Sequence, residues 1–128
     1  MPKTLELILL EEHFALTHLP IDAPEATWAR GMFAAKITSR RGTTVVCAST
    51  FVPPDVVAQT GFRCMEVAGV SQLDSVGIVA AVVNPLASAG IGIFAYSTWD
   101  TDYILVQETD LQLAASALKE AGHSLHGF

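Results

Sequence analysis

Two short polar segments of this 128-residue chain carry side chains that could hold a small charged ligand. The first is STWDTD at residues 97–102, which lies between apolar runs typical of strands. Asp100 and Asp102 could pair with an ammonium or guanidinium group, and the Trp99 ring, which is costly to expose, could cover an apolar stem. These groups complement an amino acid. The simpler alternative is a polar turn with Trp99 as a lid over the edge of the core.

The second segment is DSVGI at residues 74–78, where a helix is expected to begin. Free N–H groups in the first turn of a helix attract anions, and Gly77 lets a ligand approach the backbone closely. A carboxylate could therefore bind the amides of Val76, Gly77 or Ile78 without a cationic side chain. The local pattern alone favours a simpler interpretation, in which Asp74 or Ser75 caps the helix and Gly77 packs against a strand.

The elements around these segments predict an α+β fold. A strand at 62–68 precedes the helix, whose interior holds Pro85, and proline removes the hydrogen bond to the Ala81 carbonyl, so we expect a kink or an early end. Strands at 91–97 and 103–107 follow, then a helix that begins with a Thr109–Gln112 capping box and stops at Gly122, and a last short strand. This β-α-β-β-α-β order is the ferredoxin-like unit.

The first half of the chain predicts a shortened version of the same unit. Strands are expected at 5–10 and 14–19, a hairpin at 33–38 and 43–48, and a short helix from Pro53 to Gly61. Because a hairpin followed by a helix occurs in both halves, we expect a degenerate internal duplication. The predicted halves are residues 1–60 and 61–128.

Composition limits the classes of function. Hydrophobic residues make up 51% and charged residues 16%, which favours a homo-oligomer, most simply a homodimer. A net charge of -6 and seven basic residues disfavour nucleic acid. The apolar runs predict neither a membrane span nor a signal peptide, hence a cytoplasmic protein. Cys47 and Cys64 are expected as buried thiols, and the four histidines as surface residues without metal.

Two longer segments, DSVGIVAAVVNPLASAGI at 74–91 and YSTWDTDYILVQETDL at 96–111, resemble ACT domains. The resemblance is greatest to duplicated (tandem) ACT proteins related to the cytosolic arginine sensors. It implies two ACT-like halves, the first degenerate, with an amino acid bound where two ACT units meet. The implied contacts are Ser75, Val76, Gly77, Ile78, Thr98, Trp99, Thr101 and Asp102. Ser75 and Thr101 stand where those sensors can have an acid and an aromatic residue, so the resemblance supports an amino acid, with arginine one candidate.

Three hypotheses follow for the function. The first is a non-enzymatic, amino-acid-binding regulatory protein that needs no cofactor and has its ligand at an ACT–ACT interface. The second is a ligand-free dimerising module that docks onto a partner protein. An enzyme is the weakest, since neither a phosphate loop, nor a metal motif, nor a serine with a histidine and an acid near it in sequence is found.

Overall fold

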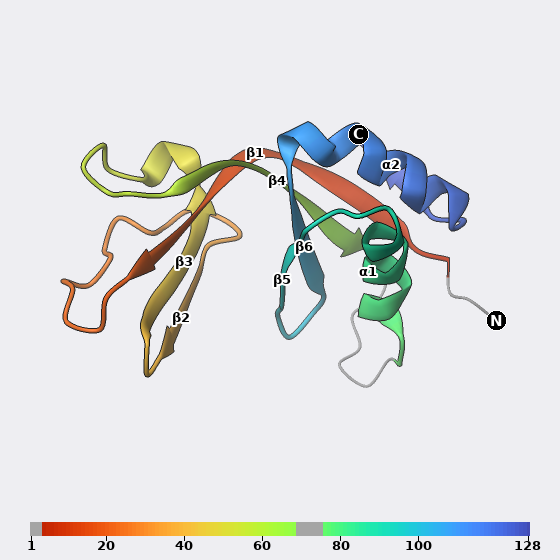
Figure 1. The fold of residues 1–128 in the computed structure, drawn as a ribbon. Helices are drawn as coiled ribbons and strands as arrows, with labels where there is room; N and C mark the ends of the chain where they lie inside the picture. Colours follow the sequence, from red (N-terminus) through yellow and green to blue (C-terminus); the bar gives the residue numbers. More distant parts are fainter. Residues whose placement is uncertain (1–3, 69–75) are drawn as a thin grey trace. The chain divides into compact units, whose positions relative to one another are not determined.

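The computed structural model describes residues 4–68 and 76–128 (Figure 1). The elements, in chain order, are β1 (Glu6–Leu19), β2 (Ala35–Ser39), β3 (Gly42–Ala48), the 3-10 turn η1 (Ser49–Phe51), β4 (Gln59–Ala68), α1 (Ile78–Ser88), β5 (Phe94–Ser97), β6 (Asp102–Gln107), the 3-10 turn η2 (Glu108–Asp110), α2 (Leu111–Glu120) and β7 (Ser124–His126).

The chain forms two compact units. The inserted unit is Glu12–Phe62, and the main unit combines Met1–Glu11 with Arg63–Phe128. The division of the chain into tandem halves at residue 60 stays a prediction.

The main unit has the predicted element order β4-α1-β5-β6-α2-β7. Its strands lie in the order β7-β1-β4-β6-β5, and the start of β1 pairs in parallel with β7, with Leu7 opposite Leu125. Alternate strand residues such as Leu7, Met65 and Val106 are buried against α1 and α2. The helices contribute Val82, Leu86 and Leu118 to this core, and β6 contributes Ile104 and Val106. Packing in this core therefore positions both α1 and the β5–β6 hairpin (Figure 1).

Helix α1 runs through Pro85 without ending there. It continues to Ser88, and the Ala89 N–H donates to the Pro85 carbonyl at 3.1 Å. Burial of Ile78, Val82 and Leu86 on one face supplies the stability that tolerates a proline in the interior.

The inserted unit contains the predicted hairpin, in which β2 and β3 pair antiparallel from Ala35 opposite Val46 to Ser39 opposite Gly42. The predicted helix after it is wrong. Only the 3-10 turn η1 forms, and residues 52–58 are turns and extended chain. Two consecutive prolines hold the residue before each in an extended conformation, and a segment this short lacks the buried face that offsets the cost of helix nucleation.

Three further expectations need correction. Strands 5–10 and 14–19 form one strand, since Glu11, Glu12 and His13 continue the extended backbone without glycine or proline. The Thr109–Gln112 capping box does not form, because η2 precedes α2 and Asp110 occupies the N-cap position without a side-chain cap bond. His123 is buried rather than exposed. Cys47 and Cys64 are both buried, as predicted.

Candidate ligand-binding site

The loop between β5 and β6 is a closed turn. The Thr98 N–H donates to the Thr101 carbonyl at 2.8 Å, so Trp99 and Asp100 occupy the tip. The Thr98 hydroxyl accepts the N–H groups of Asp100 and Thr101, each at 3.3 Å. The Trp99 side chain at this tip is 79% exposed.

Asp102 is held in place by the residue opposite it. Ser97 pairs with Asp102 across the hairpin, and the Ser97 hydroxyl donates a hydrogen bond to Asp102 Oδ1. Asp102 is half-buried, whereas Ser97 is exposed. A carboxylate oriented in this way can receive a cationic group without first losing side-chain freedom. Sequence reasoning missed Ser97, although its position opposite Asp102 about the tip was a signal that could have found it.

The base of the hairpin is aromatic. The rings of Tyr96 and Tyr103 stack with centroids 5.2 Å apart, and Phe94 lies 6.5 Å from Tyr96. Burial raises the pKa of Tyr96, and the nearby Cys64 and Tyr103 raise it further. Burial also raises the pKa of Tyr103, with added contributions from Glu66, Cys64 and Asp100. Both phenols are therefore neutral at physiological pH, and the charge of the hairpin is concentrated in its acids.

Thr101 ties the hairpin to the rest of the main unit. Its hydroxyl donates to the carbonyl of Val67, the last residue but one of β4. The chain then leaves β4 toward α1, so the turn is fixed beside the strand end from which the helix loop departs. Asp74 and Ser75, which the sequence assigned to the site, lie outside the described residues.

Helix α1 begins at Gly77, the N-cap residue, whose φ of 83° is the left-handed conformation that glycine adopts without strain. No side chain among the described residues caps this end, and the first turn contains no acid. The Val76 side chain is 83% exposed, while Ile78 is buried in the core, so only the backbone of Ile78 could reach a ligand.

The two predicted halves of the site lie at one end of the main unit. Figure 1 shows the tip of the β5–β6 hairpin and the first turn of α1 both at the lower end of this unit. Among the described residues, the hydrogen bonds of residues 98–101 stay within the turn or run to Val67, and none reaches residues 76–78. The arrangement offers an oriented acid, an exposed indole and a helix start, whose contact through a ligand stays a prediction.

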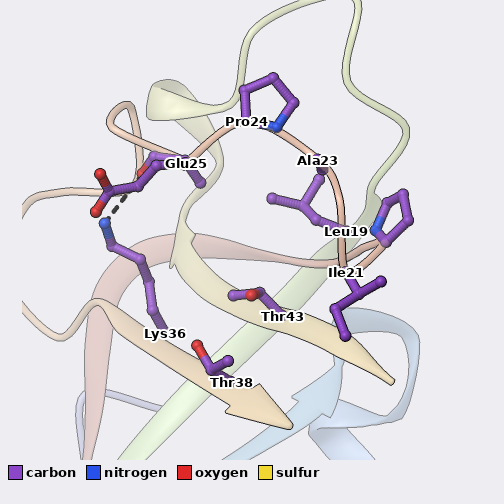
Figure 2. A pocket seen from close by; sticks show the side chains of 10 residues that line it. Leu19, Ile21, Ala23, Pro24, Glu25, Lys36, Thr38 and Thr43 are labelled. Atoms are coloured by element: carbon purple, nitrogen blue, oxygen red, sulfur yellow. Dashed lines mark hydrogen bonds between the residues drawn. The ribbon is translucent and has the colours of Figure 1, made fainter. Parts of the chain in front are cut away.

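A hollow lies in the inserted unit (Figure 2). It encloses about 120 Å³ and is lined by Leu19, Pro20, Ile21, Ala23, Pro24, Glu25, Ala26, Lys36, Thr38 and Thr43. Figure 2 shows the Glu25 and Lys36 side chains pointing toward one another, and Lys36 Nζ donates to the Ala26 carbonyl at 3.1 Å. Pockets for organic ligands usually measure roughly 300–1,000 Å³, so this hollow is small for an amino acid.

No group of three or more His, Cys, Asp or Glu is placed to hold a metal ion within residues 4–68 and 76–128. None of the helices in that part of the chain has the length and apolar character that a membrane span requires.

Comparisons with known proteins place the fold. The crystal structure of a protein from Agobacterium tumefaciens matches this chain with 34% sequence identity and a TM-score of 0.89. The match covers 96% of this chain and 92% of the Agobacterium chain. A Vibrio cholerae protein described as of unknown function and a possible transport protein is 20% identical (92% and 90% covered, TM-score 0.74). The regulatory subunit of aspartate kinase from Thermus flavus is 13% identical (94% and 99% covered, TM-score 0.67).

At 20% and 13% identity, the last two likenesses bear on the fold alone. A search of curated protein sequences finds no match. The sequence model of the ACT domain matches residues 57–120, half of the chain, and this match agrees with the observed β4-α1-β5-β6-α2 order. The chain therefore belongs to the ACT-domain family.

Proposed function

We propose that this chain is a non-enzymatic regulatory protein that binds a free amino acid at an interface between ACT units. The observation that carries the proposal is the Ser97–Asp102 pair, which orients a carboxylate beside an exposed tryptophan at the end of the unit where α1 begins. An ACT domain in the regulatory subunit of an aspartate kinase supports a regulatory role for a protein of this fold.

Each group in the proposed site has a distinct task. The Asp102 carboxylate binds the cationic group of the ligand, with Asp100 adding negative charge at the tip. The free amides near Gly77 bind the ligand carboxylate, because N–H groups at a helix start carry partial positive charge. The Trp99 ring covers the aliphatic stem. The turn residues Thr98 and Thr101 hold these groups in place.

A second copy of the chain would complete this site, which is open to solvent in the single chain. We propose a homodimer of the tandem ACT type, related to the cytosolic arginine sensors and located in the cytoplasm. A ligand that bridges two units stabilises the arrangement that completes its site, so binding would shift association or shape. Arginine is one candidate, since its guanidinium matches an oriented carboxylate.

A ligand-free dimerising module is the second candidate, and the exposed apolar side chains favour it. Trp99 and Val76 are both largely exposed, and residues 78–88 of α1 contain no charged side chain. Such a surface suits a protein partner as well as a ligand. This module would dimerise whether or not Asp102 carries a charge.

Titration calorimetry against the common amino acids tests the proposal. We expect one or a few to bind, and Asp102→Asn to lower the affinity by about 10- to 100-fold, because it removes a charge-assisted hydrogen bond. Glu25→Gln is the matched control, since it removes one negative charge from the inserted unit and leaves the hairpin intact. No heat from any amino acid at millimolar concentration, with the dimer intact in both variants, would favour the ligand-free module.

A further inference from the structure

His123 enters the core of the main unit through the turn that ends α2. Gly122 adopts a φ of 94°, its N–H donates to the Lys119 carbonyl at 2.9 Å, and the His123 N–H donates to the Leu118 carbonyl at 3.1 Å. This is the Schellman arrangement, in which the residue after the glycine is directed back against the helix. The side chain that takes this position is usually apolar, whereas here it is an imidazole with 5% of its surface exposed.

Two backbone groups determine which ring nitrogen carries the proton. The Leu5 N–H lies 3.0 Å from His123 Nδ1, and the Ala81 carbonyl oxygen lies 2.7 Å from His123 Nε2. A backbone N–H can only donate and a carbonyl oxygen can only accept. The ring must therefore be neutral, with its proton on Nε2, and it joins the start of β1 to the first turn of α1.

The carbonyl that His123 contacts is the one that Pro85 leaves without a helical partner. In a regular helix the Ala81 oxygen would accept the N–H of residue 85, but proline has no N–H and its ring pushes that carbonyl outward. The Nε2–H of His123 supplies the missing donor. Because the His123 ring replaces the missing backbone donor, the helix can contain a proline four residues after Ala81 and still continue to Ser88.

We propose that Pro85 and His123 form a proton-sensitive clasp: the proline frees the Ala81 carbonyl, neutral His123 ties it to Leu5, and protonation of the ring releases Leu5. A protonated imidazole carries N–H groups on both nitrogens, so Nδ1–H would face the Leu5 N–H, donor against donor. The bond to Ala81 survives. The start of β1 is thereby uncoupled from the helix whose first turn lies at the proposed ligand site.

Other ionisable groups on the surrounding elements are accounted for in the test. Helix α1 has none, while α2 ends with Lys119 and Glu120, which are exposed. His126 Nε2 lies 3.1 Å from the Glu6 carboxylate, and both side chains are more than half exposed. The variant His126→Gln removes this pair, so it separates any effect of the pair from that of the clasp.

Nuclear magnetic resonance of the ligand-free, nitrogen-15-labelled protein tests the protonation step. While its ring is neutral, His123 should show the Nε2–H tautomer. As the solution is made acidic, the protection factor of the Leu5 amide against hydrogen exchange should fall about tenfold. The same fall is expected in His126→Gln. An Nδ1–H tautomer, or Leu5 protection that does not change with pH, overturns the proposal.

Substitutions test the pairing of the proline with the histidine. The Asn side chain of His123→Asn can accept the Leu5 N–H but is too short to reach Ala81, so Leu5 protection should become independent of pH while Ala81 loses its donor.

Pro85→Ala restores an N–H at residue 85. We expect Pro85→Ala to raise the folding equilibrium constant of His123→Asn about tenfold more than that of the wild type. Equal effects in the two backgrounds, or pH-dependent Leu5 protection in His123→Asn, contradict the clasp; if His123→Asn does not fold, the wild-type titration decides.

Discussion

The two units of the molecule each contain a hairpin, and the two hairpins differ at the tip. The β5–β6 hairpin of the main unit turns through Trp99 and Asp100 without glycine, and its Thr98 hydroxyl closes the turn. The β2–β3 hairpin of the inserted unit turns through Arg40 and Arg41 and depends on Gly42, whose φ is 122°. One tip carries acids and an indole, and the other carries two cations.

The elements that follow the hairpins differ as well. After β6 the chain enters α2, which buries Ala114 and Leu118 in the core of the main unit. After β3 it makes only the short turn η1, and one core cluster of the inserted unit combines Ala26 and Ala29 with Val45 and Cys47 of β3. The two hairpins therefore share a topology but are followed by different elements. The helices and the side chains at the tip distinguish the two.

Substitution of Gly42 should have the largest effect on stability. A Cβ atom at Gly42 would lie 2.1 Å from the Leu19 carbonyl oxygen, in a backbone conformation that other residues rarely adopt. We expect Gly42→Ala to lower the free energy of unfolding by about 3 kcal/mol or more, measured by urea denaturation. Gly61→Ala is the control, since its φ is also positive but nothing lies within 4 Å, and it should cost about 1 kcal/mol. Equal costs would show that the close contact is unimportant.

Loss of the Thr101 hydroxyl should have a smaller effect, confined to the main unit. Thr101→Val keeps the shape of the side chain but leaves the Val67 carbonyl without this donor. We expect a loss of about 1–2 kcal/mol in unfolding free energy, measured by thermal or urea denaturation. Thr38→Val, on the exposed strand β2, should change it by less than about 0.5 kcal/mol. If Thr38→Val proved the more damaging of the two, the hairpin would not be fixed through Thr101.

The smallest effect on the unfolding free energy at neutral pH is expected from ionisation of the tyrosines. These residues report on the β5–β6 hairpin alone. The chain has two tyrosines, Tyr96 and Tyr103, and both belong to this hairpin. Because burial raises the pKa of each phenol, the unfolded chain loses these protons first as pH rises above about 10. The unfolding free energy should therefore fall from about pH 10 upward, and less steeply in Tyr96→Phe.

An absorbance titration of the phenolate checks this assignment directly. Ionisation in the folded protein should begin only above the ordinary tyrosine pKa of about 10, whereas the urea-unfolded chain should titrate at that value. Identical titration curves for the folded and unfolded chains would mean that the stacked pair is open to water.

The sequence predicted most of the main unit because its signals are local. Helical spacing of Val82 and Leu86, the stop at Gly122 and the alternation in β4 and β6 each reflect one element and the face it buries. The positions of Trp99 at the hairpin tip and of Asp102 just after it followed from the same kind of signal. No local pattern specifies a contact between that tip and the amides near Gly77, so this contact stays a prediction.

The errors arose where a tertiary partner decides the outcome. His123 looked like a surface residue because no sequence pattern shows that Pro85, 38 positions earlier, leaves a carbonyl that an imidazole can satisfy. The helix after β3 was predicted from two prolines, although it had no apolar face to bury. The first case shows that the partner of a polar group, rather than its type, determines where it lies, and the second shows that a helix start signal is not enough without a face to bury.

The two tryptophans of the chain provide the most direct test of the central claim, because Trp99 marks the hairpin tip of the main unit and Trp28 lies in the inserted unit. Their indole N–H signals can be followed by nuclear magnetic resonance while each common amino acid is added. We predict that a binding amino acid shifts the Trp99 signal and leaves Trp28 unchanged, and that Asp102→Asn suppresses the shift. A shift of Trp28 alone, or no shift of either signal at millimolar concentration, would contradict an amino-acid site at the β5–β6 hairpin.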